Sequence, residues 1–207
     1  MRGKFITIEG IEGVGKSTNI ESIAKFLMEN DIEYLVTREP GGTTLAEDIR
    51  DLLLKVDGEE PVELCELLLV FASRAQHLKK IIEPALNNGV WVLCDRFTDA
   101  TYAYQGGGRG LSGTTISQLE NLIQETLRPD LTIILDLEVA IGLSRAKNRG
   151  ALDRFEKERI EFFERVRQTY LSIAENSPDR CVVINADNER ELIAEEINTI
   201  LADRLLG

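Results

Sequence analysis

The sequence has few cysteines, and none of them form a closely spaced pair. Cys65, Cys94 and Cys181 are the only three, and they lie far apart along the chain. Disulfide frameworks and structural zinc sites both depend on paired or clustered cysteines. The sequence therefore predicts neither kind of site, and a reducing compartment is the expected location.

Long apolar runs and an excess of positive charge are also missing. No apolar run approaches the roughly 18 residues that a membrane span needs, and the chain opens on a strand-like run and a glycine-rich loop instead of a signal peptide. The formal net charge is −12, which disfavours general binding to nucleic-acid backbones because that binding depends on lysine and arginine. We expect a cytoplasmic protein that binds neither nucleic acid nor a membrane.

What the sequence does contain is an alternation of strand-like and helix-like segments. Short apolar runs rich in β-branched residues are typical of strands buried on both faces, and they occupy 5–10, 33–37, 90–95, 131–137 and 181–186. Helical spacing is found in 17–29, 43–55, 61–86, 114–127, 138–148, 156–175 and 188–205. Pro61 suits a first helical turn, whereas Pro84 is expected to kink or close its helix.

This alternation predicts the fold class. Strands that alternate with helices imply right-handed crossovers and a parallel sheet. The 207 residues, 43% of them hydrophobic, fit one domain with a substantial core. We predict an α/β fold with an open five-stranded parallel sheet flanked by helices, as a single domain over residues 1–207.

The stretch "GIEGVGKST" (10–18) follows the first predicted strand and opens the first predicted helix. Its glycines let backbone N–H groups point into one concavity, and the helix N-terminus adds positive charge there. The pattern predicts a nucleoside triphosphate site in which Lys16 reaches the β- and γ-phosphates and Ser17 binds Mg²⁺. A purely structural glycine turn capped by Ser17 is the alternative. The predicted ATP-binding residues are Gly10, Ile11, Glu12, Gly13, Val14, Gly15, Lys16, Ser17 and Thr18.

Two acidic residues near this loop call for an explanation. Glu12 lies inside the loop, where an anion weakens phosphate binding unless it faces outward, so we expect it to point toward a second ligand. Asp95 ends the run "VWVLCD" and is followed by Arg96. Such an aspartate suits a metal or its water, and the arginine suits a phosphate. The alternative is an ion pair at the sheet edge.

The segment "LLLVFASRAQHL" places Phe71 and Arg74 three residues apart on one helix face. An aromatic plane beside a guanidinium can stack on a base and bond its carbonyl. The alternative is that Phe71 lies in the core and Arg74 on the surface. His77, the only histidine, is expected on the helix surface and not in catalysis.

A local excess of positive charge occupies 145–159, with six basic and three acidic residues in a chain of net charge −12. Gly150 interrupts the helical pattern between Arg149 and Arg154. A basic hinged segment suits a lid over phosphates, so we predict a lid at about 145–156 whose arginines neutralise charge on the transferred phosphoryl group. A solvated helix-loop-helix is the alternative.

Seven stretches together resemble the thymidylate kinases, a family of P-loop nucleoside monophosphate kinases, nearly from end to end. The resemblance implies transfer of the γ-phosphoryl group of ATP to dTMP with Mg²⁺, which gives dTDP and ADP in dTTP biosynthesis. The stretches are "GIEGVGKST", "TREPGGT" (37–43), "SRAQHL" (73–78), "DRF" (95–97), "AYQGGGRG" (103–110), "PDLTIILD" (129–136) and "RGALDRFE" (149–156).

The resemblance also implies residue roles. Arg38 and Arg96 would hold the phosphate of dTMP, Arg74 would bond the thymine, and Tyr104 would exclude a 2′-hydroxyl. Glu12 would face the sugar. The remaining acceptor residues are Phe71, Thr101 and Gln105, and the implied catalytic residues are Lys16, Asp95, Arg96, Arg149 and Arg154.

The family varies in two features that this chain helps to classify: the position of the basic catalytic residue and the position of an aromatic residue near the base. The loop lacks a basic residue while the lid is basic, which resembles the bacterial arrangement with Arg149 and Arg154 reaching over ATP. The family often has an aromatic residue four positions before the base-binding arginine, where this chain has Val70, with Phe71 one position later. Homodimers packed through 43–55 and 61–86 are implied as well.

Two other functions stay open from the residues. One is a P-loop switch protein whose loops respond to the γ-phosphate, although no N-K-x-D motif is present. The other is a kinase with a different acceptor, such as dUMP, CMP or a metabolite that is not a nucleotide. An apolar pocket gains only about 1–3 kcal/mol from one methyl group, so the sequence does not decide between dTMP and dUMP.

Overall fold

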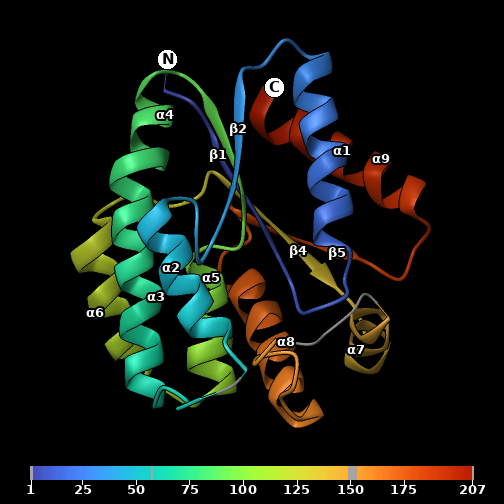
Figure 1. Ribbon diagram of the computed structural model, residues 1–207. Coiled ribbons are helices and arrows are strands. Elements are labelled where there is room, and N and C mark those ends of the chain that lie inside the picture. Colours follow the sequence, from blue (N-terminus) through green and yellow to red (C-terminus); the bar gives the residue numbers. More distant parts are fainter. Residues whose placement is uncertain (1, 57, 149–152, 207) are drawn as a thin grey trace.

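The computed structural model describes residues 2–56, 58–148 and 153–206. Five parallel strands form one sheet in the order β2-β3-β1-β4-β5 (Figure 1). The predicted open parallel sheet is confirmed. The strands are β1 (Phe5–Glu9), β2 (Tyr34–Arg38), β3 (Trp91–Asp95), β4 (Leu131–Asp136) and β5 (Cys181–Asn185).

Helices cover both faces of the sheet. Two of them, α1 (Lys16–Glu29) and α9 (Arg190–Leu201), lie together on one side, and α9 continues into the π-helical η3 (Ala202–Leu206) (Figure 1). Most of the others lie on the opposite side, and α7 lies next to α8 near the end of β4. These helices are α2 (Thr44–Leu54), α3 (Glu63–His77), α4 (Glu83–Asn87), α5 (Thr98–Thr101), α6 (Gly113–Gln124), α7 (Val139–Lys147) and α8 (Ile160–Asn176).

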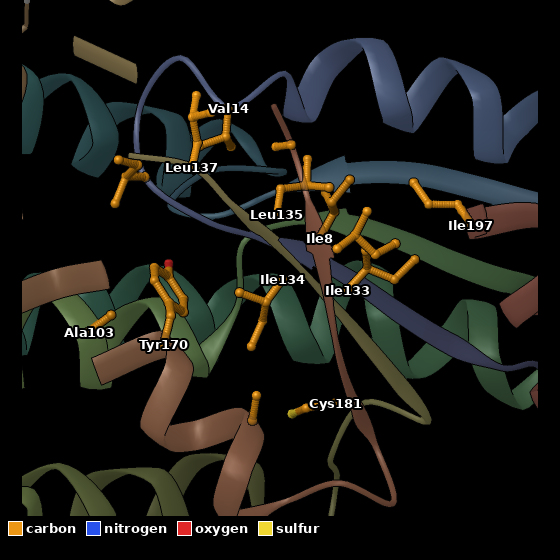
Figure 2. Close-up of a cluster of buried hydrophobic side chains, with 14 of the residues drawn as sticks. Ile8, Val14, Ala103, Ile133, Ile134, Leu135, Leu137, Tyr170, Cys181 and Ile197 are labelled. Carbon is orange, nitrogen blue, oxygen red and sulfur yellow. The ribbon is translucent and has the colours of Figure 1, made fainter. Parts of the chain in front are cut away.

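The central strands are buried on both faces, as their continuous apolar runs predict. Successive side chains of a strand point to opposite faces. In β4, Ile133 and Leu135 point toward the side of Ile197 on α9, whereas Ile134 points toward Tyr170 on α8 (Figure 2). All of these side chains are buried. Burial on both faces explains why this strand has no alternation of apolar and polar residues.

The predicted helix 61–86 is three pieces. Between α3 and α4 lies a π-helical turn, η1 (Leu78–Ile82). Pro84 lacks the N–H that an α-helix would bond to the carbonyl four residues earlier, so the helix changes type before Pro84 and continues to Asn87. Pro61 does not lie in the first turn, because α3 begins at Glu63 after Val62.

The stretch 104–110 lies outside the segments with predicted helical spacing, yet most of it is helical. A π-helix, η2 (Tyr102–Gly108), continues directly from α5 and packs against α8. A Cβ atom on Gly107 would lie 2.1 Å from Oγ1 of Thr169. Arg165 of α8 donates hydrogen bonds to the carbonyls of Gly107 and Gly108 at 3.1 and 2.8 Å. The close contact with α8 explains why glycines occur in this helix.

Because all the strands are parallel, their carboxyl ends lie at the same edge of the sheet. The glycine loop after β1 and the turns after β2 and β3 therefore meet there, which is where ligands bind in open α/β sheets. Over the described ranges, every helix is too short or too polar to cross a membrane.

Candidate active site

Two neighbouring cavities lie at the carboxyl edge of the sheet. The first measures about 200 Å³ and the second about 560 Å³. Lys16 and Asp95 line both of them. The first cavity is lined mainly by Glu12, Glu39, Pro40, Arg50, Leu53, Leu54, Val70, Arg74, Arg96, Phe97, Ala100, Thr101, Tyr104, Gln105, Asp153, Phe155 and Glu156. The second is lined by Gly13, Val14, Gly15, Ser17, Thr18, Asn19, Arg145, Ala186, Asn188, Arg190 and Ile193.

The glycine loop supplies the floor of the second cavity. Gly13 and Gly15 have φ values of 75° and 92°, a region that favours glycine. A Cβ atom on Gly13 would lie 1.9 Å from the carbonyl oxygen of Gly142 on α7. Among the residues that the structure describes, no side chain caps the start of α1 at Gly15. The first N–H groups of α1 therefore remain available to an anion such as a phosphate.

Lys16 lies where the two cavities meet. Its ammonium group donates hydrogen bonds to the carbonyls of Gly10 and Ile11 at 3.2 and 2.9 Å. Burial, followed by the positive charge of Arg96, lowers the pKa of Lys16 to about 8. Gly10 and Ile11, predicted to bind ATP, thus hold Lys16 and do not line the second cavity.

Asp95 and Ser17 provide oxygen atoms that fit a magnesium ion. Oδ1 of Asp95 is buried and has no hydrogen-bond partner within the described part of the chain. Ser17 lies in the first turn of α1 and lines the second cavity. Mg²⁺ in phosphoryl-transfer sites usually takes one or two protein oxygens together with phosphates and water. An unpaired carboxylate oxygen beside a phosphate-binding loop suits that requirement.

Arg96 and Glu12 form an ion pair at the first cavity. Nη2 of Arg96 lies 3.0 Å from Oε1 of Glu12, and Nη1 donates to the Tyr170 hydroxyl at 3.1 Å. The guanidinium also stacks 4.8 Å from the ring centre of Tyr104, whose hydroxyl donates to Glu12 at 2.7 Å. Glu12 therefore points away from the second cavity, in the direction that the charge argument predicts. Arg96 pairs with Glu12 and not with the adjacent Asp95.

Arg74 is buried in the wall of the first cavity and is not on the surface. Its Nε donates to Glu39 at 2.6 Å, and Nη2 donates to the Thr101 hydroxyl at 2.9 Å and to the carbonyl of Phe97 at 3.2 Å. Nη1 is buried without a partner in the described ranges. A buried donor without a partner is costly, so Nη1 is suited to bind an acceptor atom of a ligand, such as a base carbonyl.

The structure corrects the prediction for Phe71. Its side chain packs with Leu67 and Ile116 between α3 and α6, and it does not line the first cavity. Val70 lines that cavity instead. The two residues are about 100° apart around the helix, so only one of them can face the cavity. The guanidinium of Arg74 does lie over the Phe71 ring, 4.9 Å from its centre.

His77 was expected on a helix surface, and this expectation is wrong. The side chain is buried, with Nδ1 3.1 Å from Oε1 of Glu39 and Nε2 2.7 Å from the Thr37 hydroxyl. The turn after β2 covers this part of α3: a Cβ atom on Gly42 would lie 2.3 Å from Nε2 of His77. Spacing within α3 could not reveal this cover, because Gly42 comes 35 positions before His77 in the sequence.

The first cavity includes an arginine that sequence analysis missed. Arg50 on α2 lines the cavity and donates to the carbonyl of Pro40 at 2.9 Å. Burial, followed by the positive charge of Arg38, lowers the pKa of Arg50. Arg38, predicted to bind phosphate, lies nearby but is exposed and pairs with Glu47 at 2.8 Å. In the sequence, Arg50 differs from its neighbours only in its charge: it is a basic residue within a predicted helix, with three acidic or apolar residues on each side.

Of the two predicted lid arginines, Arg149 lies outside the described residues. Arg154 is 7% exposed and lines neither cavity. Its Nη2 lies 2.6 Å from Glu66 of α3, and its Nε donates to the carbonyl of Leu53 at 2.8 Å. Gln105 lines the first cavity and donates to the same carboxylate at 2.8 Å. In this structure Arg154 therefore anchors the segment after α7 to α3.

The far wall of the second cavity comes from the segment after β5. Ala186, Asn188 and Arg190 line it, opposite the glycine loop. Arg145 at the end of α7 completes the wall and donates to the carbonyl of Ala186 at 3.3 Å. A planar guanidinium at this point can stack on an aromatic base.

Comparisons with known proteins agree with this geometry. The sequence profile of the family described as thymidylate kinase matches residues 8–197. A thymidylate kinase from Teredinibacter turnerae is 57% identical over 97% of this chain and 98% of its own length. One from Pseudomonas putida is 55% identical, over 97% and 96%. The crystal structure of a thymidylate kinase from Ehrlichia chaffeensis superposes with a TM-score of 0.78 at 36% identity, over 97% of this chain and all of that one.

The matches extend over nearly the whole chain and include both cavities. They confirm the predicted resemblance and the predicted P-loop kinase fold. The chain belongs to the thymidylate kinase family of nucleoside monophosphate kinases.

Proposed function

We propose that this chain transfers the γ-phosphoryl group of Mg·ATP to dTMP, with the donor in the second cavity and the acceptor in the first. The single observation that supports this arrangement most is that the two cavities meet at Lys16 and Asp95. The chain is a nucleoside monophosphate kinase that phosphorylates dTMP to dTDP. We propose the following roles for its residues in that reaction.

On the acceptor side, side chains hold the monophosphate. Arg96 binds the dTMP phosphate, and Arg50 joins it from the opposite wall, with Arg38 close by. Arg74 donates from Nη1 to a thymine carbonyl, and Val70 covers the base. Thr101, Tyr104, Gln105 and Glu12 surround the sugar and the rest of the base.

On the donor side, the backbone holds the triphosphate. The N–H groups of Gly13 to Thr18 receive the phosphates, and Lys16 moves its ammonium group from the loop carbonyls to the β- and γ-phosphates. Ser17 and Asp95 hold Mg²⁺, which neutralises phosphate charge when it is bound. A phosphate oxygen of dTMP then attacks the γ-phosphorus in line, the bond to the ADP oxygen breaks, and no covalent enzyme intermediate forms.

A coupled assay of ADP release tests the proposal. We would supply Mg·ATP with dTMP, dUMP, CMP, AMP or GMP separately, and with no acceptor. We expect strong release with dTMP, and a kcat/KM for dUMP that is about 10- to 200-fold lower, since one methyl group is worth about 1–3 kcal/mol. Equal values for dTMP and dUMP would contradict selection for thymine. Release without any acceptor, or none with all five, would support the switch alternative instead.

The lid is the second part of the proposal. Residues 1–207 are a single kinase domain in which a segment at about 145–156 closes over ATP and brings Arg149 to the transferred phosphoryl group. Arg149→Ala should lower kcat much more than it raises the KM for dTMP. An effect on KM alone would make Arg149 a residue that binds the ground state only.

We also propose a cytoplasmic homodimer formed through α2 and α3. These helices expose several large apolar side chains, among them Leu45, Leu52, Leu64 and Leu68, each at least half exposed. Adjacent apolar side chains on a surface favour a protein interface. Leu64→Asp should convert the dimer to a monomer in light scattering. Leu122→Asp, at an exposed leucine on α6, should not.

A further inference from the structure

The last residue of β1, Glu9, is a fully buried acid that the proposed reaction does not use. Its side chain has no solvent-exposed surface and so cannot touch either substrate. Both carboxylate oxygens accept hydrogen bonds: Oε1 from the Phe97 N–H at 2.7 Å, and Oε2 from the Tyr170 hydroxyl at 2.8 Å. Burying a carboxylate is costly. A carboxylate at this position therefore calls for a role beyond packing.

Both contacts of Glu9 lead to Arg96. The Phe97 N–H belongs to the peptide group that joins Arg96 to Phe97. Arg96 has a φ of 68°, a conformation that is uncommon for residues other than glycine and that persists only where neighbours enforce it. The hydrogen bond from the next N–H to Glu9 is one such constraint.

The second contact reaches the guanidinium of Arg96. Tyr170 lies on α8 beneath the sheet, and its ring belongs to the same buried cluster as β4 (Figure 2). Its hydroxyl donates to Glu9 and accepts a hydrogen bond from Nη1 of Arg96 at 3.1 Å. Glu9 thus fixes the backbone of Arg96 directly and its side chain through Tyr170.

The same turn also connects to the base side of the first cavity. The carbonyl of Phe97 accepts a hydrogen bond from Nη2 of Arg74 at 3.2 Å. Phe97 is therefore held at its N–H by Glu9 and at its carbonyl by Arg74. A change at Glu9 should disturb the acceptor cavity and leave the glycine loop of the donor cavity in place.

We propose that Glu9 is a positioning residue that orients Arg96 toward the acceptor phosphate. This inference rests on the proposed role of Arg96. Arginine is effective on a phosphate only when its planar donors are aligned with the oxygens, and a misplacement of about 1 Å can cost about 100-fold in rate. Glu9 supplies that alignment from beneath the cavity.

The test compares two isosteric variants, Glu9→Gln and Tyr170→Phe, with Arg96→Ala and with the two double variants that contain it. We expect Glu9→Gln to lower kcat/KM for dTMP at least about tenfold while the KM for ATP changes less than about twofold. Tyr170→Phe should act in the same direction with a smaller effect. In the Arg96→Ala background, each second substitution should lower kcat/KM for dTMP by a further factor of less than about two. The effects of residues that act through one group are not additive.

A matched control is available on α6. Glu120 is also a buried carboxylate that receives a tyrosine hydroxyl, from Tyr102 at 2.6 Å, and an arginine, from Arg128 at 2.7 Å. It lies away from both cavities. Glu120→Gln and Tyr102→Phe should therefore lower thermal stability to a similar extent without changing kcat/KM for dTMP.

Each outcome decides the inference. An effect of Glu9→Gln no larger than that of Glu120→Gln, or full additivity with Arg96→Ala, would overturn it. If Glu9→Gln does not fold, Tyr170→Phe and its double variant decide in the same way. If Arg96→Ala leaves the KM for dTMP and kcat unchanged, the role of Arg96 is wrong and the inference falls with it. The activity of the unmodified chain on dTMP tests the proposed reaction separately.

Discussion

The two cavities are built in different ways. The second cavity takes most of its lining from one continuous stretch, Gly13 to Asn19. This stretch offers mainly backbone N–H groups and the ammonium group of Lys16. The first takes its polar groups from side chains that are far apart in the sequence. Its ion pairs join Arg96 to Glu12 across 84 positions and Arg74 to Glu39 across 35.

This difference fits the ligands proposed for the two cavities, ATP in the second and dTMP in the first. A chain of phosphates is the same in every nucleoside triphosphate, so a short loop of fixed backbone shape can hold it. A base and a sugar must be distinguished from close analogues, which requires donors and acceptors set at particular positions. We therefore expect changes at the donor cavity to act on backbone shape and charge, and changes at the acceptor cavity to act through side-chain contacts.

The largest expected effect comes from removing Lys16, a cation that lines both cavities. Lys16→Ala should lower kcat at least about 100-fold, because a donor to the transferred group is lost in the transition state. Steady-state kinetics with Mg·ATP and dTMP measure it. Lys25→Ala, at an exposed lysine of α1 that pairs with Glu29, is the matched control and should leave kcat unchanged. More than a tenth of the normal kcat in Lys16→Ala would refute this role.

The next effect tests whether the donor cavity depends on backbone shape. Gly13→Ala places a Cβ atom 1.9 Å from the carbonyl oxygen of Gly142. Position 13 also has a φ of 75°, a backbone conformation that is strained for any residue other than glycine. We expect ATP binding to weaken about 50-fold and Tm to fall. Gly113→Ala is the control, since a Cβ atom there meets nothing within 4 Å. Unchanged ATP affinity in Gly13→Ala would show that the loop tolerates a different shape.

A smaller effect is expected from the acceptor cavity. Arg74→Lys keeps a positive charge beside Glu39 but loses the donors to Thr101, to Phe97 and to the base. We expect the KM for dTMP to rise about 20-fold, because a charge-assisted hydrogen bond is worth about 1.5–3 kcal/mol. The KM for ATP should stay within about twofold. Equal increases in both KM values would show that Arg74 supports the fold and not the base.

Arg180→Lys is the matched control for that substitution. Like Arg74, Arg180 makes three hydrogen bonds to a carboxylate and to other groups: two to Asp99 at 2.6 and 2.8 Å, and one to the Thr132 hydroxyl at 3.0 Å. It does not line either cavity. Arg180→Lys should therefore lower Tm without changing the KM for dTMP.

The same contrast explains how much of the molecule the sequence could predict. The five strands were predicted to within one or two residues because each is a short, nearly continuous apolar run. Burial on both faces explains these runs in the central strands, whereas β2 and β5 at the sheet edges are partly exposed, so the expected burial on both faces is wrong for them. The donor loop was predictable because its residues are adjacent. In contrast, η2 was missed because its helical form depends on the fit of Gly107 and Gly108 against α8, and no local pattern contains that contact.

Among the residues proposed to bind dTMP, the kind of side chain was easier to predict than its position at the first cavity. Arg74 and Arg96 were predicted from local patterns as well as from the resemblance to the family, and Tyr104 from the resemblance alone. Arg50 and Glu39 were missed, since their place at the cavity depends on how α2 and the turn after β2 pack on α3. Phe71 was misplaced because residues one position apart on a helix face different ways, and only the packing of α6 shows which face is covered.

The smallest expected effect, about twofold between pH 7 and pH 8, concerns the charge of Lys16 and distinguishes the cavities by pH. Burial lowers the pKa of this lysine to about 8, so its ammonium group is present below pH 8 and is lost as the pH rises above that value. If the triphosphate needs this charge, affinity for a non-hydrolysable ATP analogue should be constant from pH 6.5 to 7.5 and fall about tenfold for each unit above pH 8. Titration calorimetry measures it.

The matched variant is Lys16→Arg, whose guanidinium keeps its charge throughout this range. Its affinity for the analogue should be lower than that of the unmodified chain at pH 7 but should not fall between pH 8 and 9.5. Because the titration of the nucleotide is the same in both experiments, only a difference between the two curves reports on Lys16. Parallel curves would mean that the charge of Lys16 does not contribute to binding of the analogue and acts only in the transition state.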